Sequence, residues 1–160
     1  NIPADTAHTG IFTYYSLRTN SIIATSDSDA VSWDMAFAGT TILVNSGTSG
    51  PGQGGAKVLT QAFSDVTEAP ESGYAVDNAP AAYAVPTGSG NGWYTYNFAA
   101  NTITPTAGKT LVIKTADGKY AKVEILNYYK NAPANPDTTS ISRFYTFQYI
   151  FQSDGTRKLN

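Results

Sequence analysis

The residues that most often carry out catalysis are scarce in this sequence. It contains one histidine, His8, and no cysteine. A serine or threonine nucleophile needs a base beside it, and His8 lies close to the N-terminus, where protein chains are commonly frayed. No GxSxG or HExxH motif is present, and a zinc site would need cysteines or a histidine pair. The sequence therefore predicts neither a serine hydrolase nor a metal centre.

Carboxylates are the other candidates for chemistry. Asp27 and Asp29 lie two residues apart in SDSDA, and a carboxylate pair can support hydrolysis. The residues after them do not continue a calcium-binding loop, so we interpret both as polar turn residues and keep hydrolysis as an alternative. Asp34 lies inside the apolar segment SWDMAF, where strand alternation predicts that it points away from Trp33 and Met35. An inward carboxylate there would need hydrogen-bond partners.

A glycine-rich segment, GTSGPGQGG at residues 47–55, satisfies GxGxxG in form through Gly50, Gly52 and Gly55. A dinucleotide site needs a helix that begins at this loop within a βαβ unit. The sequence that follows, AKVLTQAF, gives no such pattern, and no Walker motif is present. We therefore interpret the segment as a flexible surface loop.

Composition excludes some partners. The net charge is −2, and charged residues make up 14% of the chain. Nucleic-acid binding needs a clustered positive surface, and the ten Lys and Arg residues are scattered. The densest basic group is interpreted as a solvated strand face: Lys109, Lys114, Lys119 and Lys122. No apolar run approaches the roughly 20 residues that cross a bilayer, so no transmembrane segment is predicted.

Alternation of apolar and polar residues, broken by Gly, Pro, Asn and Asp, recurs along the chain. It predicts strands at 11–17, 21–25, 32–37, 41–45, 93–98, 102–104, 110–115, 119–129 and 143–151. Asp117-Gly118 favours a type I′ turn between two of them. The segments 68–92 and 132–136 are rich in proline and are predicted as loops, the first of them long and mobile. We expect an all-β fold, an antiparallel two-sheet sandwich with long irregular loops, as a single domain over residues 1–160.

One strand carries a row of aromatic residues on a single face. The row consists of Tyr145, Phe147, Tyr149 and Phe151. Such rows usually form half of a sandwich core.

Several segments together resemble the HmuY-like proteins, a family of exported haem-binding lipoproteins of Bacteroidota. They are WDMA at 33–36, NSGTSGPGQGGA at 45–56, SGYAVD at 72–77, Gly92-Trp93, ADG at 116–118 with AKV at 121–123, and the aromatic strand at 144–151. The resemblance covers nearly the whole chain in the order of the family. It implies an all-β fold, no enzymatic activity, and a lipoprotein anchored in the outer membrane and exposed at the cell surface, or released from it. A signal or anchor segment would then lie outside this sequence.

The resemblance also implies a haem held by two axial His or Met side chains, one after the SGYAVD segment and one after the Gly-Trp pair. This sequence departs from that pattern. No His or Met follows Asp77, Phe98 stands where the second ligand is expected, and the only methionine, Met35, belongs to the WDMA core strand. Haem bound here would therefore not be held by a His or Met pair. Tyrosine can also bind ferric haem iron.

We predict a non-enzymatic binding protein for haem or porphyrin that serves haem acquisition, with an outer-membrane receptor as a candidate partner. The candidate ligand-binding residues are aromatic: Tyr83, Trp93, Tyr94, Tyr96 and Phe98. The alternative is a divergent member of the family that binds another hydrophobic ligand or a partner protein.

Overall fold

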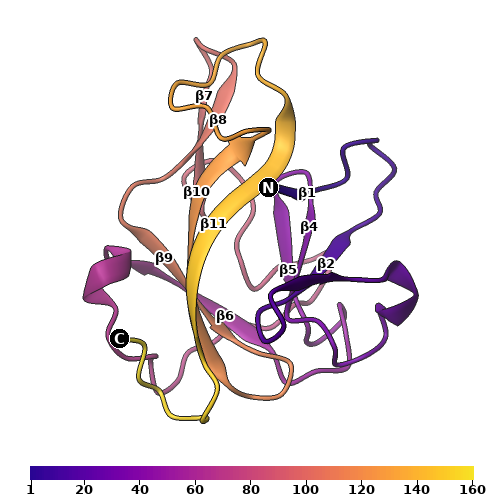
Figure 1. The fold of residues 1–160 in the computed structure, drawn as a ribbon, viewed down its shortest axis with the longest axis vertical. Helices are drawn as coiled ribbons and strands as arrows, with labels where there is room; N and C mark the ends of the chain where they lie inside the picture. Colours follow the sequence, from indigo (N-terminus) through magenta and orange to yellow (C-terminus); the bar gives the residue numbers. More distant parts are fainter.

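Period-two alternation gives eleven strands in the computed structural model, which describes all of residues 1–160 (Figure 1). The strands are β1 (Ile2–Pro3), β2 (Thr13–Ser16), β3 (Ser21–Ile23), β4 (Met35–Ala38), β5 (Thr41–Val44), β6 (Gly55–Thr60), β7 (Tyr94–Asn97), β8 (Thr102–Pro105), β9 (Lys109–Lys114), β10 (Tyr120–Tyr129) and β11 (Ser142–Gln152). Two short 3-10 helices, η1 (Thr25–Asp27) and η2 (Phe63–Asp65), complete the regular structure. No helix is long and apolar enough to span a membrane.

The strands form two main antiparallel sheets and one projecting hairpin. The larger sheet has the order β1-β11-β10-β9-β6, and the smaller one has the order β3-β2-β4-β5. Strands β7 and β8 pair only with each other and extend beyond the larger sheet at the upper end of Figure 1. The predicted all-β, antiparallel, sandwich-like fold is confirmed.

The main core lies between the two sheets. The β11 aromatic row faces it: Tyr145 is fully buried, and Phe147, Tyr149 and Phe151 are partly buried against the core. From the smaller sheet, Phe37 packs against Tyr145 and Phe147 at ring-centroid distances of 4.8 and 5.7 Å. The row is therefore a core element, as its alternation predicts.

Two strands were not predicted. The strand β1 pairs with β11, and Ala4 behind it is fully buried, so the N-terminus is held in the sheet and not frayed. The strand β6 begins at the last glycine of GTSGPGQGG and pairs along its whole length with β9. The segment predicted at 32–37 becomes a strand only from Met35.

The β9–β10 turn is wider than the two-residue type I′ turn that Asp117-Gly118 suggested. Its closing pair is Thr115 and Lys119, and the Gly118 N–H donates to the Thr115 carbonyl at 2.9 Å. Of the turn residues only Gly118 has a positive φ, 83°, whereas type I′ requires two such residues. The arrangement is a three-residue loop in which glycine supplies the single left-handed position.

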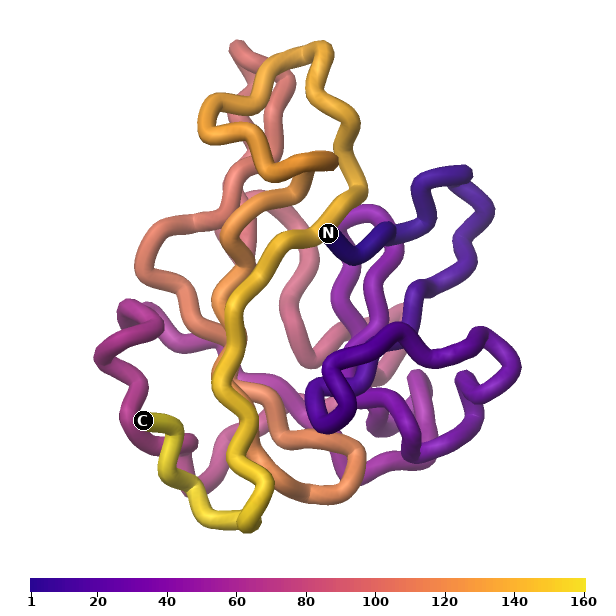
Figure 2. The backbone as a smooth tube through the Cα atoms, in the orientation of Figure 1, coloured from indigo at the N-terminus to yellow at the C-terminus, as the bar shows by residue number.

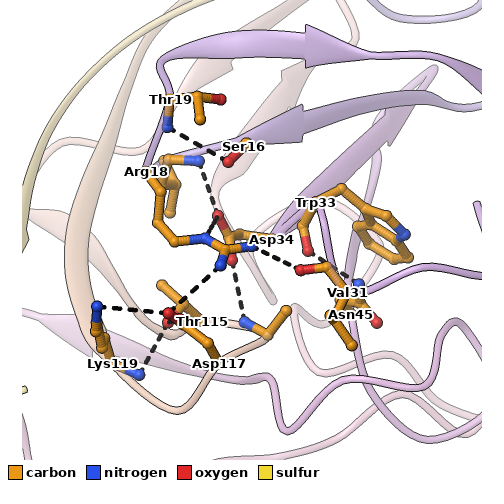
Figure 3. Close-up of polar contacts among 12 residues, drawn as sticks. Ser16, Arg18, Thr19, Val31, Trp33, Asp34, Asn45, Thr115, Asp117 and Lys119 are labelled. Carbon is orange, nitrogen blue, oxygen red and sulfur yellow. Dashed lines mark hydrogen bonds and ion pairs between the residues drawn. The ribbon is translucent and has the colours of Figure 1, made fainter. Parts of the chain in front are cut away.

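Asp34 is fully buried, not directed outward as alternation suggested (Figure 3). It lies just before β4, and its carboxylate accepts hydrogen bonds from the Leu17 N–H at 2.9 Å and the Ala116 N–H at 3.0 Å. The Arg18 guanidinium lies 3.9 Å from the same carboxylate and 3.4 Å from that of Asp117. Burial nevertheless raises the Asp34 pKa, and these contacts only partly oppose the shift. Asp34 thus links the smaller sheet to the β9–β10 turn of the larger one.

The glycine-rich loop is packed, and the prediction that it is flexible is wrong. The Asn45 side chain accepts from the Gly52 N–H at 2.8 Å and donates to the Trp33 carbonyl at 2.9 Å. A Cβ at Gly52 would come within 2.7 Å of the Asn45 carbonyl oxygen, and one at Gly54 within 2.6 Å. The glycines are therefore needed for close approach, with no helix after them to bind a dinucleotide.

Lys122 does not belong to a solvated face. It is 3% exposed, and its ammonium donates to the carbonyls of Phe63 and Val66 at 2.8 and 2.9 Å. The same nitrogen lies 4.4 Å from the Phe63 ring centroid. Burial lowers the pKa of Lys122. The lysine holds η2 and the segment after it against the outer face of the larger sheet.

The long segment 68–92 is irregular, as predicted, but it is anchored at its centre. Asp77 is 1% exposed, and its carboxylate accepts from the Val44 N–H at 2.9 Å and the Ala84 N–H at 2.7 Å. Ala75 also forms an isolated bridge with Ala56 of β6. These contacts hold the segment to both sheets, so it does not form a free loop.

Candidate ligand-binding site at the β7–β8 hairpin

Core packing fixes the β7–β8 hairpin at its base. Trp93, just before β7, is 2% exposed, and its indole N–H donates to the Thr40 carbonyl at 3.0 Å. The indole packs against Tyr94, Tyr128 and Tyr145 at centroid distances of 5.0, 5.6 and 5.1 Å. Burial in this cluster raises the pKa of Tyr128 to about 12 and that of Tyr145 well above its usual range. These phenols are therefore neutral and act as packing groups.

A register shift in β10 also supports the hairpin. The pairing of β10 with β11 is irregular around Asn127, and the consecutive residues Tyr128 and Tyr129 are both buried. Tyr128 enters the core, whereas the Tyr129 hydroxyl accepts from the Ile103 N–H of β8 at 2.8 Å. Such bulges re-aim side chains that regular alternation would send to opposite faces. Here the bulge connects the larger sheet to the hairpin.

The free end of the hairpin carries two accessible aromatic rings. Tyr96 is 39% exposed and Phe98 is 87% exposed. The rings meet edge to face, with centroids 6.3 Å apart and an interplanar angle of 83°. The Tyr96 hydroxyl donates to Asn101 Oδ1 at 2.7 Å, which fixes the ring across the hairpin. We call these two rings the aromatic corner.

The segment 130–141 between β10 and β11 lies at the same end of the molecule as the hairpin (Figures 1 and 2). A recess of about 260 Å³ separates them. The hairpin contributes Tyr96, Asn101 and Ile103 to its lining, and the other side consists of Tyr129, Asp137, Thr138, Ser140 and Ser142. The candidate site therefore has an aromatic wall and a polar wall.

The five predicted ligand-binding residues do not form one surface. Tyr96 and Phe98 lie at the exposed end of the hairpin, whereas Trp93 and Tyr94 are in the core below it. Tyr83 is half-buried in a separate cluster with Trp33, and it does not line the recess. Trp93 and Tyr94 can position the hairpin but do not reach a ligand as the chain stands.

Sequence reasoning did not identify the polar wall of the site. Residues 132–136 were interpreted only as a loop between strands, and nothing in the sequence shows that this region faces a hairpin about 30 residues earlier. Asp137 follows a proline and precedes two Thr residues, which is a common turn pattern. Its Oδ1 accepts from the Thr139 hydroxyl and N–H at 2.7 and 2.9 Å, and these bonds lower the Asp137 pKa.

The side chains that most often bind haem iron are not near the aromatic corner. Met35 is fully buried in the main core, and His8 lies in the exposed loop between β1 and β2. No group of three His, Cys, Asp or Glu residues is arranged to hold a metal ion. The residues present therefore do not fit a haem held by a His or Met pair.

Comparison with known proteins identifies a family and two similar structures. The HmuY protein family matches residues 10–149. The chain belongs to the HmuY family. A "putative lipoprotein" of Bacteroides fragilis NCTC 9343 has a similar structure, with a TM-score of 0.54 and 18% identity over 86% of this chain and 82% of that one. A "putative HmuY_like heme binding protein" of Bacteroides vulgatus ATCC 8482 has a TM-score of 0.51 and 18% identity over 86% of this chain and 83% of that one. Among curated proteins, none matches significantly.

The comparisons confirm the resemblance found in the sequence. In this HmuY chain, the Gly-Trp pair forms the buried base of the β7–β8 hairpin, and the SGYAVD segment leads to the buried Asp77. Both family segments therefore contribute to the fold of this chain, whether or not a ligand binds. At identities of 18% the two solved structures support the shared fold alone.

Proposed function

We propose that this HmuY protein is an exported, non-enzymatic binding protein that takes haem or a porphyrin on the aromatic corner, without a His or Met ligand on the iron. The observation that carries the proposal is Phe98. This side chain is 87% exposed at the end of a projecting hairpin and belongs to none of the buried clusters of the chain. Exposed apolar groups grouped in this way are typical of ligand or partner sites.

The chemistry of the corner fits a flat apolar ligand. The edge-to-face pair of Tyr96 and Phe98 offers ring surfaces in two directions, and the Tyr96 hydroxyl is held by Asn101. Covering one exposed aromatic side chain contributes about 1.5–3 kcal/mol, which must outweigh the loss of ligand freedom on binding. Such a site would bind by contact area and would discriminate little between a porphyrin with iron and one without it.

Family membership supports haem as the first ligand to test, because the Bacteroides vulgatus neighbour is described as HmuY-like and haem-binding. It also supports the cellular context proposed here, which is an outer-membrane lipoprotein, exposed at the cell surface or released, that passes haem to a membrane receptor for iron acquisition. The Bacteroides fragilis neighbour is described as a "putative lipoprotein", which supports the lipoprotein part of this proposal.

The experiment compares haem with iron-free protoporphyrin IX. Each is titrated into the protein while the Soret band and the tryptophan fluorescence are followed. We expect the two affinities to agree within a few-fold, because no side chain coordinates the iron. The Phe98→Ala variant should bind both at least tenfold more weakly, since about 1.4 kcal/mol corresponds to a factor of ten. Ile11→Ala, at a residue 56% exposed outside the aromatic corner, is the matched control and should bind like the wild type.

Two results would contradict this proposal in different ways. Haem that binds far more tightly than protoporphyrin would show an axial ligand from the chain. A high-spin ferric spectrum would be typical of a tyrosine ligand, and Tyr96→Phe would then test it. If neither porphyrin shifts the Soret band at micromolar concentration, porphyrin binding is excluded. The second candidate would then remain, in which the same aromatic corner contacts another hydrophobic ligand or a partner protein.

A further inference from the structure

The recess beside the aromatic corner has a chemistry that haem does not match. Its volume of about 260 Å³ is below the 300–1,000 Å³ of pockets that enclose drug-sized ligands. A four-ring macrocycle does not fit inside it, whereas a single six-membered ring does. The recess is therefore suited to a smaller ligand than the aromatic corner can support.

Polar groups with unused hydrogen-bonding capacity surround this recess. Asp137 Oδ1 accepts all of the carboxylate's hydrogen bonds from the chain, and its Oδ2 accepts none. Asn101 uses only its carbonyl oxygen, as acceptor for Tyr96, so its amide N–H groups are free to donate. The hydroxyls of Thr138 and Ser142 make no hydrogen bond within the chain, and both residues are exposed. The lining thus offers both donors and acceptors, which suits ligand hydroxyl groups, since each can donate and accept.

The charge of the recess narrows the ligand class further. Asp137 forms no ion pair, and neither Lys nor Arg lines the recess. An exposed aspartate is ionised at neutral pH, and the hydrogen bonds to Oδ1 lower the Asp137 pKa further. An uncompensated carboxylate repels ligand carboxylates and phosphates, and it accepts strong hydrogen bonds from neutral hydroxyls.

The walls of the recess are fixed before any ligand arrives. The Tyr96 hydroxyl is bonded to Asn101, the Tyr129 hydroxyl to the Ile103 N–H, and Asp137 to its own turn. A preformed site loses less conformational freedom on binding than a mobile one. The exposed part of Tyr96 also provides an aromatic surface against which the C–H groups of a ring can pack.

We propose that the recess between the β7–β8 hairpin and segment 130–141 binds a neutral sugar ring. In this arrangement one sugar face packs on Tyr96, and two neighbouring hydroxyls bond to Asp137 Oδ2 and to the amide of Asn101. The site is distinct from the proposed porphyrin contact on Phe98, although both use Tyr96, and it does not depend on that function.

Saturation-transfer difference NMR with methyl glycosides of glucose, galactose and mannose, and with N-acetylglucosamine, tests the site. We expect at least one of these probes to bind with a dissociation constant in the millimolar range, as for a single small ring. Glucuronic acid, in which a carboxylate replaces the CH2OH group of glucose, should bind at least tenfold more weakly than glucose. Asp137→Asn should weaken the neutral sugar about tenfold and reduce the discrimination against glucuronic acid.

Control variants keep a failure to fold apart from a loss of binding. Ser142→Ala removes one exposed hydroxyl from the polar wall and should weaken binding without altering stability, whereas Ile11→Ala should leave binding unchanged. The near-ultraviolet circular dichroism of the buried aromatic residues, which include Trp33 and Trp93, reports whether the core and the hairpin base are intact in each variant. The proposal is overturned if no neutral sugar gives a signal at 50 mM (about fiftyfold above a dissociation constant of 1 mM), or if the signal survives Asp137→Asn and Ser142→Ala undiminished. Phe98→Ala should weaken porphyrin binding at least tenfold and leave the sugar signal, so the two proposals can fail separately.

Discussion

Replacing the buried Asp34 by alanine should cost this protein a large part of its stability. The carboxylate is fully buried and accepts the Leu17 N–H at 2.9 Å and the Ala116 N–H at 3.0 Å. Both donors belong to residues at most 3% exposed, so water cannot easily replace the lost acceptor. Each unsatisfied buried N–H costs about 1–3 kcal/mol, which gives about 2–6 kcal/mol for the pair. Domains of this size are usually stable by only about 5–15 kcal/mol.

Asparagine at this position separates the acceptor from the charge. Asp34→Asn keeps one carbonyl oxygen for one of the two N–H groups but points an amide donor at the other. We expect a loss of about 1–3 kcal/mol, smaller than that of Asp34→Ala. Arg18 keeps its other contacts in both variants, to Asp117 at 3.4 Å and to the Val31 carbonyl at 2.6 Å. The Arg18 guanidinium therefore keeps a charged partner in both variants.

Urea unfolding followed by far-ultraviolet circular dichroism measures these differences, with the denaturant slope checked for two-state behaviour. Asp29→Ala is the matched control, because Asp29 is exposed and makes no hydrogen bond or ion pair within the chain, and it should change stability by less than about 0.5 kcal/mol. If Asp34→Ala lost less than about 1 kcal/mol at an unchanged slope, the two backbone bonds would not hold the sheets together as argued here.

Three further predictions concern other contacts. Burial alone would raise the pKa of Asp117, but the hydrogen bond from the Thr115 hydroxyl and the contacts with Arg18 and Lys119 lower it overall. The stabilising effect of the ionised carboxylate is therefore present above about pH 4 and lost as the pH falls further. Asp117→Asn should therefore flatten the acid limb of a thermal-stability profile between about pH 2 and 5, and an unchanged limb would contradict this. Lys122→Met keeps the aliphatic stem but removes two hydrogen bonds from a charged donor, and we expect a loss of about 2–4 kcal/mol in urea unfolding with ligand binding unchanged. Gly52→Ala would place a methyl group 2.7 Å from the Asn45 carbonyl oxygen and should lower stability by about 1–3 kcal/mol, whereas Pro51→Ala in the same loop should be nearly neutral.

Local alternation was sufficient to predict most of the sandwich, because each face of a half-buried strand meets one environment along its length. The prediction was wrong at residues whose surroundings are set by distant parts of the chain. Asp34 precedes β4, and its partners lie 17 and 82 residues away in the sequence, so no local pattern could reveal them. The edge strand β6 follows directly on a glycine-rich loop whose composition obscured its start. Lys122 is buried because η2 and the chain after it cover its side of the sheet, which is a tertiary effect.

Aromatic composition predicted the region of the candidate site but not its surface. Trp93 and Phe98 are five residues apart, yet one is 2% exposed and the other 87%. The difference arises because the hairpin leaves the sandwich after Tyr94, and the residues of β7 that follow it are exposed. Residue type alone does not show where the hairpin leaves the core. The polar wall opposite was hidden for a similar reason, since its segment meets the hairpin only through the fold.

This geometry separates the parts of the molecule that hold the fold from those available for binding. The cluster around Trp93 fixes the direction of the hairpin and shares its aromatic rings with the main core, so substitutions there would disturb stability and binding together. Phe98, Asp137, Thr138 and Ser142 are exposed, and their replacement should change what is bound at little cost in stability. On the functions proposed above, a HmuY chain without axial His or Met residues keeps the family's scaffold, and the exposed ends of the β7–β8 hairpin and segment 130–141 would set its ligand. Binding measurements on the wild type and on variants at these ends, and not further comparison of the scaffold, will identify that ligand.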